Sequence, residues 1–205
     1  MSKRKIMIAV GACLLLLTGC GSTSLPENID KTTISVDAEG KVTAYLVGNF
    51  EKEYYNVSEL MEMAVEDAAA YNTEAKTGES VPVAVETVEM LENGTDVRIT
   101  YQYDSAESYA DYMGGVLFYG TVAEAYEAGY DLQTAPLNSV KDGTSATADF
   151  IKNEAAEKHV LITDQIAEIY CPYAVTYISA DAFYNENGSV TNNQSDDVIY
   201  ILLKK

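Results

Sequence analysis

The chain has 205 residues, a formal net charge of −19, and 16 tyrosines but no tryptophan. Its surplus of acidic side chains opposes binding to nucleic acid and to anionic lipid headgroups, because both carry charge of the same sign. It has no glycine-rich phosphate loop, no HExxH motif and no calcium-binding loop, so the sequence predicts no cofactor and no metal site.

The first twenty residues have the parts of a bacterial lipoprotein signal peptide. Lys3, Arg4 and Lys5 form a positively charged start, and residues 6–17 are uncharged and largely apolar, as in a secretory signal. At about 1.5 Å per helical residue, this stretch is too short to cross a bilayer core of about 30 Å. It ends in Leu-Thr-Gly-Cys at residues 17–20, which resembles the lipobox of bacterial lipoproteins.

The resemblance covers the first tenth of the chain and implies that Cys20 carries lipid. The mature protein would then lie on the extracytoplasmic face of the cell membrane, held there by two or more acyl chains, which anchor stably. The alternative is an ordinary secretory signal with a chance cysteine. We therefore expect a signal peptide over 1–19, a lipidated cysteine and flexible tether over 20–31, and a single domain over 32–205. Without the signal peptide, 10 basic residues face 32 acidic ones, a formal charge of −22.

A β-hairpin and a helix are predicted directly after the tether. Strand-like runs occupy 32–37 and 41–47, separated by a short turn. The helix covers 57–71, with Asn56 as its N-cap and Glu59 at the capping-box spacing.

Three glutamates of this helix could be mistaken for a metal or acid–base cluster. Glu59, Glu62 and Glu66 fall within about 60° of one another on a helix that turns about 100° per residue. Because the apolar residues gather on the opposite side, we expect the three carboxylates to face water. The apolar set is Leu60, Met61, Ala64, Val65, Ala68 and Tyr71.

A second hairpin has the strongest turn signal in the chain. Its strands, over 81–91 and 96–103, flank Asn93 and Gly94, a pair that supplies the positive φ angles of a type I′ turn. In the returning strand, alternate residues are apolar, so we expect one face to pack against the core and the other to be solvated.

Two short helices are predicted next, over 105–113 and 122–128. Ser105 or its predecessor caps the first helix, and Gly114 follows its last residue. The second begins with a capping-box spacing from Thr121 to the glutamate three residues later.

The last third of the chain is predicted to be mostly strand. An irregular connection over 131–143 and a helix over 146–158 precede four runs with strand-like patterns. The final run is apolar on both faces, which is typical of a central strand covered on both sides. Residues 185–197 are rich in Asn, Ser, Asp and Gly, so we expect an exposed loop there. The four runs are 159–163, 166–171, 174–179 and 198–203.

Hairpins interleaved with helices, without a regular strand–helix alternation, predict an α+β fold. We expect a mostly antiparallel sheet with short amphipathic helices packed on it. A body of about 186 residues is long enough to bury about 70% of its unfolded surface.

Cys171 is the one cysteine that remains in the mature body, so no internal disulfide can form. A nucleophilic thiol needs a base or a positive neighbour, and His159 is the only histidine in the chain. The alternative to such a dyad is a buried, unreactive cysteine.

The many tyrosines are compatible with a binding surface. Tyrosine combines an apolar ring with a hydroxyl group, which suits sugars and peptides laid across a groove, and it also suits plain packing. Tyr101 and Tyr103 continue the apolar face of their strand, so we expect them at the core. The candidate ligand-binding residues are Tyr54, Tyr55, Tyr109 and Tyr112.

Three functions are compatible with these features. The leading one is a non-enzymatic, lipid-anchored domain that binds a glycan, a peptide or an envelope protein; the body is similar in style to small acidic lipoproteins of Gram-positive gut bacteria. The alternatives are a carboxylate-dependent hydrolase acting on cell-wall or dietary polymer, and a structural subunit of a membrane complex. A groove holding two carboxylates would favour the hydrolase. A tyrosine-lined groove without them would favour binding.

Overall fold

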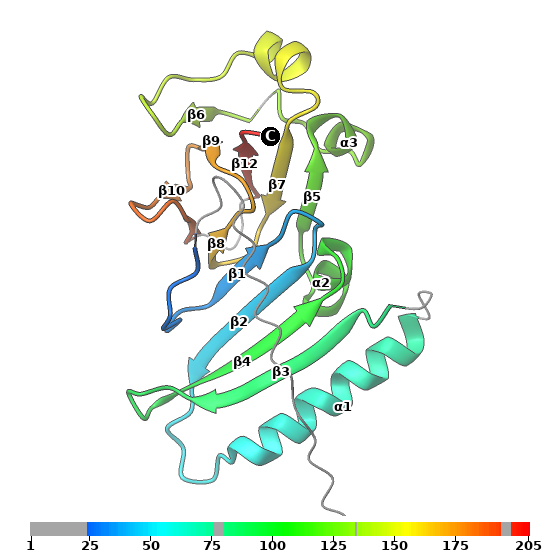
Figure 1. Ribbon diagram of the computed structural model, residues 1–205, viewed down its shortest axis with the longest axis vertical. Coiled ribbons are helices and arrows are strands. Elements are labelled where there is room, and N and C mark those ends of the chain that lie inside the picture. Colours follow the sequence, from blue (N-terminus) through cyan, green and yellow to red (C-terminus); the bar gives the residue numbers. More distant parts are fainter. Residues whose placement is uncertain (1–23, 76–79, 134, 194–197) are drawn as a thin grey trace, which may run out of the picture.

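The computed structural model describes residues 24–75, 80–133, 135–193 and 198–205. They form two mostly antiparallel sheets with helices packed against them (Figure 1), which confirms the predicted α+β class. Within these ranges no helix has the length and apolar character needed to span a membrane. Cys20 and the signal peptide lie outside the described residues, so the lipid anchor stays a prediction.

The larger sheet, sheet A, contains both predicted hairpins. Its strand order is β10-β11-β8-β1-β2-β4-β3. The pairs β1–β2 and β3–β4 are antiparallel, as predicted, whereas β1 and β8 are parallel. The strands of sheet A are β1 (Thr33–Val36), β2 (Val42–Asn49), β3 (Val83–Met90), β4 (Asp96–Tyr103), β8 (Ala167–Tyr170), β10 (Phe183–Tyr184) and β11 (Val190–Asn192).

The smaller sheet, sheet B, has the order β5-β7-β12-β9-β6 and is antiparallel throughout. β12 is its central strand, as its two apolar faces predicted. Ile201 packs into the core that sheet B shares with sheet A, and Leu202 packs into a second core on the opposite face. The strands of sheet B are β5 (Leu117–Thr121), β6 (Leu137–Ser139), β7 (His159–Thr163), β9 (Val175–Ser179) and β12 (Ile199–Leu203).

The helices are α1 (Val57–Ala75), α2 (Ala106–Met113), α3 (Val122–Glu127) and a short π-helical turn, η1 (Phe150–Glu154). Asn56 caps α1 by accepting a hydrogen bond from the backbone N–H of Ser58 at 2.8 Å. Ser105 caps α2, and Thr121 and Glu124 form the predicted capping box of α3.

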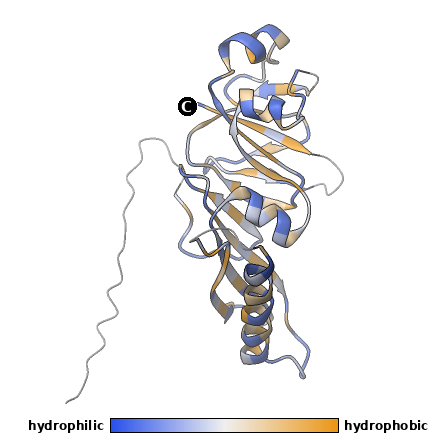
Figure 2. Cartoon of the chain, turned by 90° about the vertical axis from the view of Figure 1, so that its right-hand side faces the viewer, coloured by the Kyte–Doolittle hydropathy of each residue, from blue (hydrophilic) through white to orange (hydrophobic). Residues whose placement is uncertain are grey.

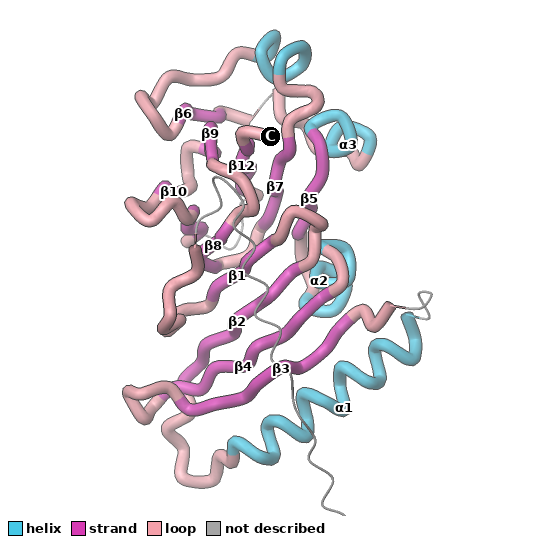
Figure 3. The backbone as a smooth tube through the Cα atoms, viewed as in Figure 1, coloured by secondary structure: helices cyan, strands magenta, loops and turns pink. Residues whose placement is uncertain are grey.

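Helix α1 runs along β3 (Figure 3) and packs against that strand of sheet A. The side chain of Asn72 donates to the carbonyl of Val83 at 2.7 Å and accepts from its N–H at 3.0 Å. The small residues Ala64 and Ala68 are buried at this contact. The outward side of α1 is hydrophilic (Figure 2), and its three predicted solvent-facing glutamates are exposed. Val65 was expected to pack but is 45% exposed, because it lies at the edge of the apolar stripe, about 100° around the helix from the buried Ala64.

The turn of the second hairpin differs from the predicted type I′ turn. Leu91 N–H donates to the carbonyl of Asp96 at 2.8 Å, so the loop consists of the four residues 92–95 that the predicted strand bounds leave between them. The side chain of Asn93 explains this, because its Oδ1 accepts the N–H groups of both Thr95 and Asp96 at 3.0 Å. Local side-chain hydrogen bonds of this kind stabilise a wider turn.

Three other expectations are corrected in the second half of the chain. The helix expected over 146–158 is shorter: residues 148–149 are helical and lead directly into η1. The connection over 131–143 contains β6, and β5 was not predicted at all. The loop expected over 185–197 contains β11, whose Val190 is fully buried, because its polar neighbours bond one another and can therefore leave water. Residues 194–197 of that loop lie outside the described ranges.

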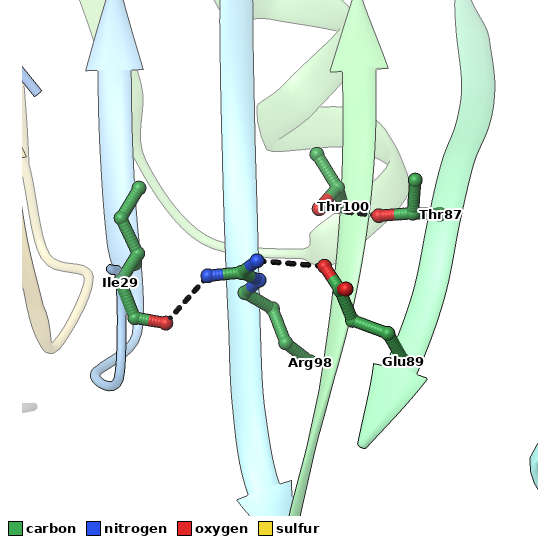
Figure 4. A network of polar contacts seen from close by, with 5 residues as sticks. All are labelled: Ile29, Thr87, Glu89, Arg98 and Thr100. Carbon is green, nitrogen blue, oxygen red and sulfur yellow. Dashed lines mark hydrogen bonds and ion pairs between the residues drawn. The ribbon is translucent and has the colours of Figure 1, made fainter. Parts of the chain in front are cut away.

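The folded part begins before Thr32, within the segment expected to be a tether. Ile29 is 6% exposed, and its carbonyl accepts a hydrogen bond from Arg98 Nη1 at 2.7 Å (Figure 4). Nη2 of the same guanidinium group pairs with Glu89 Oε1 at 2.6 Å. This contact fastens the chain before β1 to one face of β4.

Candidate functional site

The structure divides the four candidate tyrosines into two pairs. Tyr54 and Tyr55, in the loop before α1, are 76% and 43% exposed. Tyr109 is only 1% exposed, and Tyr112 is half-buried against the core. Tyr109 therefore cannot belong to a binding surface, because no ligand reaches a side chain covered on all sides.

Tyr109 and Tyr112 belong to a tyrosine cluster between α2 and β4. The ring of Tyr109 meets that of Tyr103 edge-on at 5.0 Å between centroids, and Tyr112 lies 5.7 Å from Tyr101. Burial raises the pKa of Tyr101, Tyr103 and Tyr109 above the usual value of a tyrosine hydroxyl. The cluster thus has a packing role, in which aromatic pairs stabilise the contact between helix and sheet.

Tyr54 and Tyr55 lie at the rim of a groove of about 500 Å³, which we name the α1 groove. Its floor is part of sheet A, and its wall is the first half of α1, where Leu60 and Met63 line it. Met63 is 61% exposed. The other lining residues are Leu46, Val47, Gly48, Asn49, Phe50, Asn56, Glu59, Val97 and Ile99.

The floor of the α1 groove follows from the register of β2 and β4. Leu46 pairs with Ile99 and Gly48 pairs with Val97, and residues two apart on a strand point to the same face. A Cβ atom added to Gly48 would have no atom within 4 Å. The missing side chain therefore leaves the floor open at this point.

The aromatic rim is held by its own packing and by the backbone. The ring of Tyr55 lies 4.7 Å from that of Phe50 and 4.9 Å from that of Tyr54, in the second case edge-on. Phe50 N–H donates to the carbonyl of Thr95 at 2.7 Å, which ties the start of this loop to the second hairpin. The rim is thus partly organised without a ligand.

The polar groups of the α1 groove are few. Among the described residues that line it, Glu59 is the only one with a charge, and Asn49 and Asn56 carry amides. Such a site can hold an apolar ligand group and orient it with a small number of polar contacts. It offers no pair of carboxylates for glycosidic hydrolysis.

Cys171 is buried. This agrees with the alternative prediction, in which the cysteine is unreactive and forms no catalytic dyad with His159. Burial raises the pKa of its thiol to about 12, which disfavours the reactive thiolate. His159 packs between the rings of Tyr119 and Tyr173, at 5.3 and 5.7 Å. In the described part of the chain, no three His, Cys, Asp or Glu side chains are grouped so that they could hold a metal ion.

Tyr54 and Tyr55 were predicted from the sequence, whereas the floor and the wall of the groove were not. The position of Gly48 near the end of an apolar strand could have been noticed in the sequence, because a glycine in a strand can mark a place where a ligand or another backbone approaches closely. Met63 carried no such signal, since its exposure depends on how α1 lies on the sheet.

The fold and the groove define an α+β domain that presents an apolar, tyrosine-rimmed groove to solvent. No model of a protein family, no characterised protein and no solved structure matches the chain. The function is therefore inferred from the groove itself.

Proposed function

We propose that the protein is a lipid-anchored, extracytoplasmic domain that binds a ligand in the α1 groove and does not act on it chemically. The observation that carries this proposal is the exposed pair Tyr54 and Tyr55 beside an open apolar floor. The volume of the groove is in the range of ligand sites, and its lining has the same balance of apolar and polar groups.

The position of the N-terminal segment supports this arrangement. Ile29 is bonded to Arg98, whereas the groove is lined by Val97 and Ile99. Successive residues of a strand point to opposite faces, so the segment and the groove lie on opposite faces of sheet A. An anchor that precedes Ile29 would therefore leave the groove free for a ligand.

Binding is favoured over hydrolysis and over a purely structural role. A hydrolase of the proposed kind needs two carboxylates at its site, and the groove offers Glu59 alone. A purely structural subunit requires only a surface for contact with its partner. The open space above Gly48 has a use in ligand binding and none in such a contact, so it favours a ligand.

The anchor is tested by replacing Cys20 with alanine. We expect Cys20→Ala to move most of the protein from the membrane fraction to the soluble fraction, because the replaced thiol can no longer carry the acyl chains that hold it. Cell fractionation and phase separation in detergent measure this. Cys13→Ala, in the apolar stretch of the signal peptide, is the matched control and should stay on the membrane; a Cys20→Ala protein that also stays would contradict the lipobox assignment.

The groove is tested by filling its floor with Gly48→Leu. The new side chain meets open space, so we expect the melting temperature to change by less than about 2 °C while binding of the neutral apolar dye Nile red weakens about tenfold or more. The methyl signal of Met63 in ¹³C-methionine NMR should move with the dye in the wild type, and that of Met113, packed against the core, should not. Equal dye binding by both proteins would refute the groove as the site.

A further inference from the structure

The chemistry of the α1 groove indicates its ligand: we infer that it binds a peptide segment in which apolar side chains accompany a lysine or an arginine. This inference rests on the proposed function and specifies the class of ligand that the same groove binds. Three features of the groove support it: the apolar floor, the single carboxylate and the volume.

The floor and wall favour apolar side chains. Leu46, Ile99 and Leu60 present aliphatic surface to the groove. A sugar ring brings hydroxyl groups around its whole edge, and each one that loses water without a partner costs free energy. Leucine-like or aromatic side chains have no such cost, and the flexible thioether of Met63 can adapt to their shape.

The charge of the groove favours a cation. Glu59 lies on the same groove as the rings of Tyr54 and Tyr55, and a carboxylate beside aromatic rings attracts an ammonium or guanidinium group by ion pairing and by the ring faces. The described lining contains no lysine or arginine, so an anionic ligand would have no counter-charge. The net charge of −19 adds a long-range attraction for cations.

The size of the groove favours an extended segment. A volume of about 500 Å³ holds a few side chains and not a folded domain. Asn56 Oδ1 caps α1, which leaves its Nδ2 group to donate to a peptide carbonyl. Asn49 makes only long hydrogen bonds, of 3.4 and 3.5 Å, which a peptide backbone can replace. A small ligand of the same charge would leave these amides unused.

The test compares three capped hexapeptides in which leucine alternates with lysine, glutamine or glutamate. The full chain is held in nanodiscs of neutral phosphatidylcholine, and binding to empty nanodiscs is subtracted. We expect the lysine peptide to bind about tenfold more tightly than the glutamine peptide, because an exposed ion pair and a cation–π contact together give about one factor of ten. The glutamate peptide should bind most weakly, and the preference should shrink at high salt.

Two variants of equal charge locate the effect. Glu59→Gln should remove most of the preference for lysine over glutamine. Glu66→Gln removes the same charge from an exposed position of α1 outside the groove and should keep the preference. Gly48→Leu should abolish binding of the lysine peptide.

Each result supports or overturns the inference. Equal binding of the lysine and glutamine peptides, both blocked by Gly48→Leu, would overturn the cationic ligand and leave the proposed binding function intact. Equal losses in Glu59→Gln and Glu66→Gln would trace the preference to overall charge and also overturn it. If the wild-type protein binds Nile red but none of the peptides, the peptide class is overturned. If it binds neither Nile red nor a peptide, the proposed function itself is refuted.

Discussion

Tyr109→Ala will destabilise the protein by about 3–5 kcal/mol, because it removes an aromatic ring from the centre of a packed cluster. The side chain is 1% exposed, its ring meets that of Tyr103 at 5.0 Å, and its hydroxyl donates to Gln165 Oε1 at 3.3 Å. For a domain of this size, the expected loss lowers the melting temperature by about 6–20 °C. Denaturant unfolding followed by circular dichroism measures the change in free energy.

Two control variants show how much of the loss is due to the hydroxyl group of Tyr109 and how much follows from removing any tyrosine. Tyr109→Phe keeps the ring and loses one long hydrogen bond, so we expect it to cost about 1 kcal/mol or less. Tyr54→Ala changes a side chain that is 76% exposed and should alter stability by no more than about 0.5 kcal/mol. If Tyr109→Ala cost as little as Tyr54→Ala, the tyrosine cluster would not be part of the core.

Raising the pH from 8 to 11 will lower the free energy of unfolding by several kcal/mol. Burial raises the pKa of the Cys171 thiol to about 12, and burial and the hydrogen bond to Glu168 raise that of Tyr170 to about 12. In the unfolded chain these groups release their protons near pH 9 and 10, so the unfolded state binds fewer protons above those values. The stabilisation is complete below about pH 9 and is lost as the pH rises through the folded pKa values, by up to about 1.4 kcal/mol per pH unit and group.

Thermal unfolding at pH 8, 9, 10 and 11 tests this dependence. Tyr109 contributes to it, because burial raises its pKa in the folded state. Tyr109→Phe removes one titrating hydroxyl, so its stability should fall less steeply between pH 10 and 11 than that of the wild type. Tyrosinate absorbance at pH 11 should rise sharply on unfolding. A melting temperature that stays constant up to pH 11 would show that these hydroxyl groups reach water in the folded state.

The features that were predicted correctly depend on residues close together in the chain. The capping box of Thr121 and Glu124 joins residues three apart, and the hairpin β1–β2 pairs neighbours across a short turn. The central position of β12 was predictable because Ile201 and Leu202 are apolar on opposite faces, which only a doubly covered strand tolerates.

The features that were missed depend on distant partners. The composition of 185–197 is that of a loop, yet Val190 is buried there, because β11 pairs with β8 some twenty residues away. Ile29 was expected in a tether, yet it is buried, and its carbonyl accepts a hydrogen bond from Arg98, 69 residues along the chain. Neither partner can be identified from local composition.

Local patterns of residues were enough to predict the α+β class, the hairpins and the helix caps, and to select the candidate tyrosines. Which of those tyrosines reach solvent depends on tertiary packing, because Tyr54 and Tyr55 are exposed whereas Tyr109 lies in the core. All three have the same side chain, and their exposure depends on what packs against them. Tyr109 lies on the buried side of α2 and its ring packs on Tyr103 of β4, whereas the first half of α1 leaves the groove beside Tyr54 open. The groove exists because β2, β4 and α1 meet in space, and its opening at Gly48 is visible only once they do.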